Sequence, residues 1–271
     1  MDISATLTIA GKEFRDRIRN RWVLAVALVF TVFALVIAYF GGAQQGAVGF
    51  RSVEFTIASL VSLVIYLIPL IALVLGFDAI VGERERGSLE LLLSLPITRF
   101  ELLLGKYLGL ASALALSTIV GFGLVAAVMA TETGADALPA YLLFTLSSVL
   151  LGMAFLSIAV MLSVFAADRT RASGLAIAVW FFFVLIFDLL LLGALVVTGG
   201  SYGGDIFPWL LLLNPADVFR VLNIFSLEEV RNLHGLATVF PEAIAETWAL
   251  TLVMLAWIAA PLAVATWSFR K

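Results

Sequence analysis

Few residues in this chain could carry chemistry, and they lie far apart. Asp188 lies within the apolar run Phe181–Leu190, His234 is the single histidine, and Met153 and Met161 are eight positions apart. The chain has no cysteine, which excludes disulfides, zinc–thiolate clusters and thiolate relays. Two methionines on one helical face suit packing better than a copper relay. We therefore expect no metal site and no resident cofactor in this chain.

Asp188 is an intramembrane polar residue if the run around it crosses a bilayer. An acid in such a helix costs about 3 kcal/mol on insertion scales, so its side chain must meet a partner or a wet cavity. Two interpretations are open. The acid contacts a substrate path or a conformational switch, or it satisfies a neighbouring helix or a subunit interface. The sequence does not name its partner.

Signatures of catalysis are missing from the sequence. It has no Gly-x-x-x-x-Gly-Lys-Ser/Thr phosphate loop, so we expect no P-loop ATP site here. The segment closest to an intramembrane aspartyl protease motif, Tyr202–Asp205, lies in a predicted loop, and a Gly-x-Ser-x-Gly element is absent. The sequence predicts a non-catalytic protein with no catalytic residues.

A charged stretch from Val81 to Glu101 separates two long apolar runs and has the pattern of a folded connector. Gly87 can end the incoming helix, Ser88 can cap a new helix, and Pro96 cannot continue it. Thr98 and Glu101 have the spacing of a capping box that begins the next helix. We therefore expect an ordered connector.

The short helix within this connector is predicted to be amphipathic. Leu89, Leu92 and Leu93 fall on one helical face, whereas Glu90 and Ser94 lie off it. This pattern favours a surface helix that presses on a partner. The alternative is an ordinary membrane-surface loop with solvated charges.

Composition places these features in a membrane protein. The chain has 271 residues, of which 63% are hydrophobic and 13% charged, and its mean hydropathy of +1.13 excludes a soluble globular domain. We predict an all-α fold with six membrane-spanning helices. They are expected near residues 22–40, 55–77, 103–130, 138–166, 173–197 and 248–269.

Residues 1–21 precede the first span and predict an amphipathic helix lying in the membrane interface. Its apolar positions keep helical spacing, with charged residues on the other faces. These apolar positions are Ile3, Leu7, Ala10, Phe14 and Ile18. A frayed basic tail is the alternative. We expect the first apolar run to be a retained span and not a cleaved signal.

Lysine and arginine positions predict the orientation. With the N-terminus inside, all of the 16 Lys and Arg residues except Arg51, Arg220 and Arg231 fall on the cytoplasmic side. We therefore expect a multi-pass membrane protein with both termini cytoplasmic. The connector 81–101 is then cytoplasmic, and segment 198–247 is a periplasmic loop.

Segment 198–247 is too long to be without structure. Its apolar piece 206–213 is too short to cross a bilayer and predicts a re-entrant or interfacial helix. Residues 216–225 predict a second helix with Val218, Leu222 and Phe225 on one face, and Ser226 with Glu229 predicts a further capping box. Together they predict a helical cap on the outer face.

The connector resembles the cytoplasmic coupling segment of ABC-2 type transporter permeases. The resemblance rests on Gly82–Glu90, Leu92–Leu93, Pro96–Arg99 and Gly105–Lys106. It implies a permease domain over 22–271 in a bacterial inner membrane, with two copies in a homodimer within the lipid bilayer. It also implies a separate cytoplasmic ABC ATPase dimer that holds ATP and Mg. The implied ATPase-coupling residues are Gly82, Glu83, Arg84, Glu85, Arg86, Gly87, Glu90, Pro96 and Arg99. The short turn with Asp168 and Arg169 adds a second contact by the same resemblance; by itself it is a tight polar turn.

Within that family the chain most resembles the branch that supports copper-site maturation of nitrous oxide reductase in denitrification. The grounds are its length of 271 residues, the connector and the run Asn214–Arg220. The resemblance implies a periplasmic copper-handling partner, which we expect to contact Asn214, Pro215, Asp217 and Arg220. Because metal-binding side chains are scarce, we expect the outer helices of 206–245 to act mechanically on that partner. No nucleic-acid partner is expected.

Two rival functions remain open from the sequence. An ATP-independent secondary transporter or channel would carry polar groups in several spans, whereas Asp188 is nearly alone. A structural membrane anchor would not need a capped, charged connector. Both rivals predict that no ATPase associates with the chain.

Overall fold

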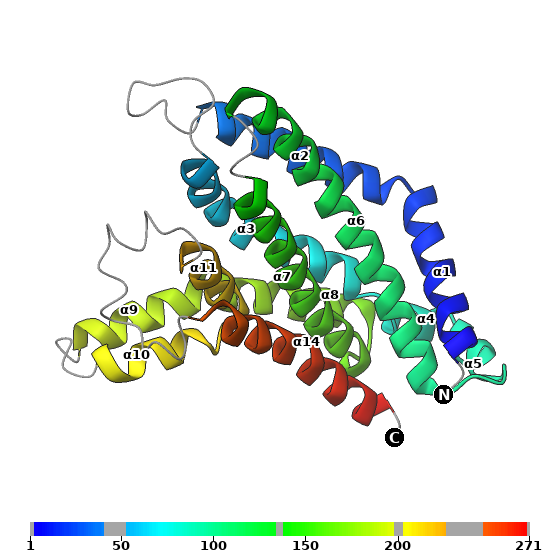
Figure 1. Cartoon of the computed structure of the whole chain (residues 1–271). Helices are drawn as coiled ribbons and strands as arrows, with labels where there is room; N and C mark the ends of the chain where they lie inside the picture. Colours follow the sequence, from blue (N-terminus) through cyan, green and yellow to red (C-terminus); the bar gives the residue numbers. More distant parts are fainter. Residues whose placement is uncertain (1–2, 41–52, 134–137, 198–202, 226–245, 270–271) are drawn as a thin grey trace.

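The structure of the chain is a computed structural model that describes residues 3–40, 53–133, 138–197, 203–225 and 246–269 (Figure 1). Helices are the regular elements of these residues, and none of them lies in a strand. The all-α prediction is confirmed. The predicted capping box at Ser226 and Glu229, and His234, lie outside the described residues.

Six helical segments are long and apolar enough to cross a membrane, as the sequence predicted. The fifth is continuous through α8, the π-helical segment η2 and α9. The span helices are α2 (Trp22–Phe40), α3 (Val53–Gly76), α6 (Arg99–Thr133), α7 (Leu138–Phe165), α8–η2–α9 (Arg169–Phe181, Phe182–Ile186 and Phe187–Val197) and α14 (Thr247–Phe269). The sequence predicted that the third span begins near residue 103. α6 begins earlier, at Arg99, because its N-terminal cap lies before the apolar run.

α7 is the central helix of the bundle (Figure 1). It packs against α3, α6 and α14, and against the short helix α11 (Pro215–Phe225) at one end. In the most apolar 18-residue stretch of α7, 72% of the residues are buried. In the corresponding stretch of the fifth span, 17% of the residues are buried. Met153 and Met161 are partly buried on α7 and pack against the core. The fifth span therefore has far less packing than α7.

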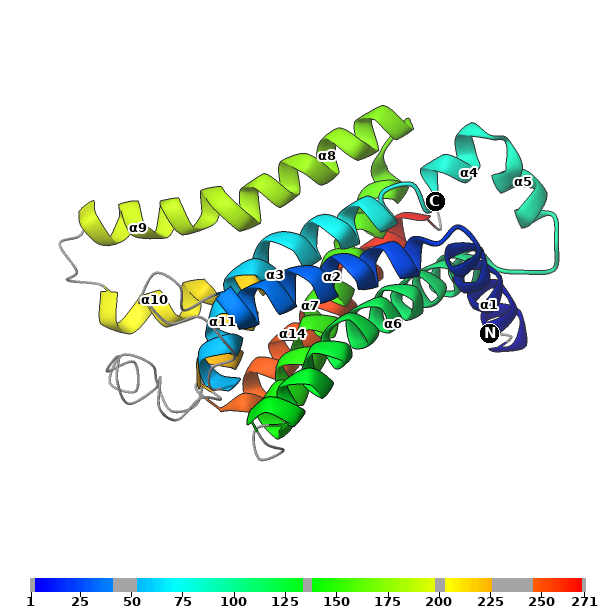
Figure 2. The same cartoon turned by 90° about the horizontal axis from the view of Figure 1, so that it is seen from above.

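The N-terminal helix and the C-terminus lie at one end of the molecule, next to the short helices α4 (Val81–Glu85) and α5 (Ser88–Leu93) (Figures 1 and 2). α10 (Gly203–Leu211) and α11 lie at the other end, between the fifth span and the bundle. This arrangement puts the connector at the same end as both termini.

α1 (Ile3–Arg19) packs along the first turns of α6 through a polar face. Thr6 and Glu13 on this face are buried, whereas Ile3 and Leu7 of the predicted apolar stripe are exposed. The chain then turns sharply into α2 at Arg21, whose φ of 56° is left-handed. The position of α1 in a membrane interface stays a prediction. Of its apolar stripe, Ile3, Leu7 and Ile18 are exposed, whereas Ala10 and Phe14 are half-buried.

Gly109 of α6 allows the close approach of α1. A Cβ atom at Gly109 would lie 2.6 Å from the carbonyl oxygen of Ala10 and 2.6 Å from Cβ of Glu13. We expect Gly109→Val to lower the stability of the chain by about 1 to 3 kcal/mol, because the backbone of α1 would have to move away. Thermal unfolding in detergent, followed by size-exclusion chromatography, measures the loss.

Gly123 offers a matched control on the same helix, because a Cβ there meets nothing within 4 Å. Gly123→Val is expected to unfold at the wild-type temperature. Equal behaviour of the two valine variants would contradict the close approach of α1 and α6.

Candidate coupling surface

The connector folds into α4 and α5 joined at Gly87, and this part of the structure is the candidate coupling surface. Gly87 has a φ of 70°, a left-handed value that glycine adopts without strain, and its N–H donates to the carbonyl of Arg84 at 3.1 Å. It ends α4, as predicted. The predicted cap at Ser88 is wrong: Gly87 occupies the N-cap position, and the Ser88 hydroxyl donates back to the carbonyl and carboxylate of Glu83.

α5 has an inner and an outer face. Leu89 is buried, and Leu92 and Leu93 pack partly buried against the core, as the amphipathic pattern predicted. On the outer face Leu91 is 71% exposed, and Leu95, just beyond the end of α5, is 54% exposed. Because two leucines in one short segment remain uncovered beside charged residues, this face is suited to contact another protein.

Most connector residues between Glu85 and Pro96 are exposed. We define the coupling edge as the exposed residues Glu85, Arg86, Gly87, Glu90, Leu91, Leu95 and Pro96. Gly82 and Glu83, which were predicted together with these residues, are buried and face the bundle.

The N-termini of α4 and α6 are both capped by side chains. The N–H groups of Ile80 and Val81 donate to Oγ of Ser163 on α7, at 2.9 and 3.0 Å. At α6 the predicted capping box is confirmed: the N–H of Thr98 donates to Oε2 of Glu101 at 2.9 Å, and the N–H of Glu101 donates to Oγ1 of Thr98 at 3.2 Å. These caps fix where the connector begins and ends.

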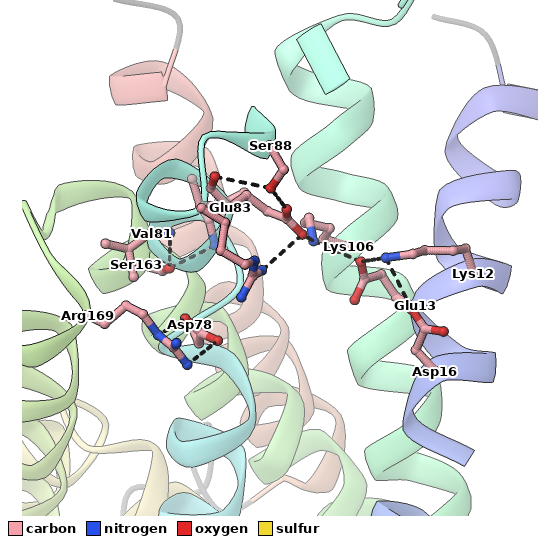
Figure 3. A network of polar contacts seen from close by, with 12 residues as sticks. Lys12, Glu13, Asp16, Asp78, Val81, Glu83, Ser88, Lys106, Ser163 and Arg169 are labelled. Carbon is pink, nitrogen blue, oxygen red and sulfur yellow. Dashed lines mark hydrogen bonds and ion pairs between the residues drawn. The ribbon is translucent and has the colours of Figure 1, made fainter. Parts of the chain in front are cut away.

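A buried ion cluster holds the connector from behind (Figure 3). Lys106 of α6 places its Nζ 2.8 Å from Oε1 of Glu13 on α1 and 2.9 Å from Oε1 of Glu83 on α4. The Lys106 side chain is 5% exposed, so water screens these interactions little. Lys12 also pairs with Glu13, at 3.2 Å. Three helices distant in sequence are thus joined at one ammonium group.

Two arginines connect the same region to the ends of span helices. Arg84 donates from Nη1 to the carbonyl of Ala166 at 2.9 Å, just beyond the C-terminus of α7. Arg99 donates from Nη1 to the carbonyl of Phe269 at 2.8 Å, at the end of α14. Both guanidinium groups satisfy carbonyls that a helix C-terminus leaves unpaired. A displacement of the connector therefore acts on α7 and α14.

The turn between α7 and α8 adjoins the connector. Asp168 caps α8, accepting the N–H of Arg171 at Oδ1 over 2.8 Å. The N–H of Arg169 donates to Oε1 of Glu85 at 2.7 Å, and its guanidinium pairs with Asp78, with Nε 2.7 Å from Oδ1 and Nη2 2.9 Å from Oδ2 (Figure 3). The two predicted coupling segments therefore form one surface.

Glu13 predicts a pH dependence of stability. Burial by itself would raise the pKa of its carboxyl, but Lys106 and Lys12 outweigh burial and hold the pKa below the ordinary value of 4.5. The unfolded carboxyl therefore takes up a proton at higher pH than the folded one. The stabilisation is present above pH 4.5 and is lost as the pH falls through the folded pKa.

We expect Glu13→Gln to unfold at a lower temperature than the wild type at pH 7, with a smaller difference as the pH falls below 4.5. Thermal unfolding at a series of pH values measures this difference. Glu132→Gln, at an exposed carboxylate near the other end of α6, is the control and should follow the wild type. A difference between Glu13→Gln and wild type that stays constant with pH would contradict the assignment.

At the opposite end, the residues expected to contact a partner form a network inside the chain. Arg220 of α11 places Nη2 2.9 Å from Oδ2 of Asp188 and Nη1 2.6 Å from Oδ1 of Asp217. Nδ2 of Asn214 donates to Oδ2 of Asp217 and to the carbonyl of Phe183, each at 2.9 Å. Asp188 therefore pairs with Arg220. Because Asn214, Pro215 and Asp217 are buried, direct contact with a partner stays a prediction.

Comparison with known proteins identifies the family of the chain. The family model described as "ABC-2 family transporter protein" matches residues 7–271. The chain belongs to the ABC-2 family of transporter permeases. It is 46% identical over 270 residues to a protein of Pseudomonas aeruginosa named "Probable ABC transporter permease protein NosY", with 97% of each chain covered. It is 44% identical over 267 residues to a protein of the same name from Stutzerimonas stutzeri, again with 97% of each covered.

Several residues that position the coupling surface of this permease were not identified from sequence. Lys106 entered the sequence analysis through the family resemblance and as a positive charge on the cytoplasmic side, and Glu13 as part of a charged helix face, but the two were not paired with each other. Ser163 carried no signal, because a serine in an apolar helix is common. A lysine at the start of an apolar span was a usable signal, since a buried cation needs a nearby acid.

The described residues of the permease contain no group of three or more His, Cys, Asp or Glu side chains arranged to hold a metal ion. The charged side chains described above are instead used in ion pairs and caps. The arrangement is suited to transmit movement. The exposed connector is joined by ion pairs, hydrogen bonds and caps to the ends of α6, α7, α8 and α14.

Proposed function

We propose that this ABC transporter permease subunit couples ATP binding and hydrolysis by a separate cytoplasmic ATPase dimer to the extracytoplasmic end of the molecule. The observation that carries the proposal is the coupling edge. Its residues are exposed to solvent, and the adjacent Glu83 is held toward the bundle by its ion pair with Lys106, which also binds Glu13. A surface that receives force needs such support, since a loose loop would absorb the movement. The sites that we assign to ATPase contact are the coupling edge and the turn at Asp168 and Arg169.

The proposed assembly contains two copies of the permease in a bacterial inner membrane, with both termini cytoplasmic. The location of α1, α5 and the C-terminus at one end supports this orientation, because the lysine and arginine residues cluster there. ATP and Mg belong to the ATPase, and the permease contributes no catalytic group.

The names of the two relatives support a finer proposal, which is a role in copper-site maturation of nitrous oxide reductase. In this proposal copper is the cargo of a periplasmic copper-handling partner. The permease moves that partner through its outer segment of residues 198–247, and no copper ligand is assigned to it.

The test is purification of the permease in mild detergent after expression with its neighbouring reading frames, followed by mass identification and an ATPase assay. We expect a P-loop ATPase and a periplasmic protein to co-purify and ATP to be hydrolysed. Recovery of the permease alone without ATP hydrolysis would overturn the proposal and favour a secondary transporter. Recovery of the ATPase without a periplasmic protein would overturn only the finer proposal.

A further inference from the structure

The fifth span is held by a few polar contacts and little packing. It runs along one side of the bundle (Figure 2), and its spanning window is only 17% buried. Near its middle, Nε1 of Trp180 donates to the carbonyl of Tyr66 at 3.0 Å, close to Pro69 in α3. The other strong contacts lie at its inner end and near its π-helical segment. The position of this span therefore depends on a small number of side chains.

At its inner end the span is joined to the coupling surface. Arg169, the first residue of α8, pairs with Asp78 and donates its N–H to Glu85 at 2.7 Å. Because Glu85 belongs to the coupling edge, a displacement of this edge reaches the fifth span without passing through the core.

Toward the outer end the span contains the π-helical segment Phe182–Ile186. A π-turn widens the helix, weakens its regular hydrogen-bond ladder and often marks a place where the helix bends. The carbonyl of Phe183, within this segment, accepts a hydrogen bond from Nδ2 of Asn214 at 2.9 Å. Asp188, just beyond it, pairs with Arg220. α11 thus contacts the span where its own hydrogen bonding is weakest.

α11 itself is fixed to the bundle on its other side. Nδ2 of Asn223 donates to Oγ of Ser147 on α7 at 3.0 Å. Phe219 packs against Phe144 of α7, with ring centroids 6.2 Å apart. Nε1 of Trp257 on α14 donates to the carbonyl of Leu212, just before α11, at 3.0 Å. α11 therefore joins the core to the span. The span also meets the core directly through Phe183, whose ring centroid lies 5.9 Å from that of Phe155 on α7 and 5.6 Å from that of Trp257 on α14.

We propose that α11 is a latch that holds the fifth span at its π-helical segment through Asn214 and Arg220. The latched span then transmits movement between the coupling edge and the outer end of the permease. This second statement rests on the proposed function, whereas the latch itself is a property of the isolated chain.

The test of the latch uses two spin labels on the permease alone in lipid nanodiscs, diluted with unlabelled chain. The chain has no cysteine, so single cysteines can be introduced without background. Leu189 on α9 and Leu142 on α7 are suitable positions, because both are more than half exposed. The label-to-label distance distribution reports how firmly the span is held.

The latch variant combines Asn214→Ser with Asp188→Asn. Serine keeps an oxygen that can cap α11 in place of Asn214 Oδ1, which accepts the N–H of Ala216 at 3.0 Å, but removes the amide that reaches Phe183. Asp188→Asn removes one ion pair and leaves Arg220 paired with Asp217. Neither change leaves a buried charge alone, so the variant should fold.

Asn223→Ser is the matched control: it removes a buried amide from α11, while Phe219 and the Trp257 hydrogen bond still hold α11 to the bundle and both contacts with the fifth span are kept. We expect the distance distribution to broaden about twofold in the latch variant and to keep its wild-type width in the control. Wild-type width in the latch variant, or equal broadening in both, would overturn the latch.

A second measurement separates the latch from the proposed function. In the complex with ATPase, nucleotide should shift the label distance in wild type and in Asn223→Ser, but not in the latch variant, although the ATPase stays bound. An undiminished shift in the latch variant would overturn transmission through this span. Failure of the ATPase to bind any of the three chains would count against the proposed function, while the measurement on the isolated chain still decides the latch.

Discussion

The Lys106→Met variant is expected to lose about 3 kcal/mol of folding stability, because two buried carboxylates lose their shared buried cation and keep only the exposed Lys12 and Arg86 as partners. Glu13 and Glu83 have side chains that are 10% and 11% exposed, and each lies within 3 Å of the Lys106 ammonium. Methionine fills the space of the lysine stem but supplies no charge. The variant should therefore aggregate or unfold at a much lower temperature in a detergent-stability assay.

A second variant separates loss of charge balance from loss of packing. The triple substitution Glu13→Gln, Glu83→Gln and Lys106→Met removes all three charges, and it should recover most of the lost stability. Wild-type stability of the single Lys106→Met variant would contradict a buried ion cluster. A triple variant as unstable as the single one would show that packing of the lysine stem dominates.

The Leu91→Glu variant is expected to keep the fold of the permease and to lose its ATPase. Leu91 is 71% exposed, so a carboxylate there meets water in the isolated chain and costs little. In the proposed complex the same carboxylate would be buried against the partner. An unpaired buried charge in a contact of this kind should weaken binding more than tenfold.

Pull-down of the tagged ATPase from membranes measures this loss, and thermal stability of the permease verifies the fold. Thr131→Glu is the control, since Thr131 is exposed near the other end of α6. It should retain wild-type binding. ATPase binding by Leu91→Glu at the wild-type level would exclude the outer face of α5 from the contact.

The sequence predicted well what depends on short-range pattern. The six apolar runs and the capping box of Thr98 with Glu101 were read correctly because each rests on residues within a few positions of one another. Gly87 was read correctly for the same reason. Ser88 was assigned wrongly, since serine suits a cap but the adjacent glycine already occupied that position.

Contacts between distant residues could not be predicted from one sequence. Asp188 was recognised as an acid in need of a partner, but Arg220 lies 32 positions away in the chain and was assigned to an outer helix as a contact for a periplasmic partner. Lys106 and Glu13 are 93 positions apart, and their pairing depends on how α1 folds back along α6. Local pattern gives the elements, and only their packing decides which charges meet.

The central position of α7 has a consequence for biogenesis. α3 and α6 pack against α7, which is made after both of them, and α11 and α14 pack against it from the other side. A nascent chain that has not yet delivered residues 138–165 into the membrane leaves α3 and α6 without the helix against which both pack. We therefore expect the first three spans to complete their packing only when the fourth arrives, and the unfinished protein to be most open to a membrane protease before that point.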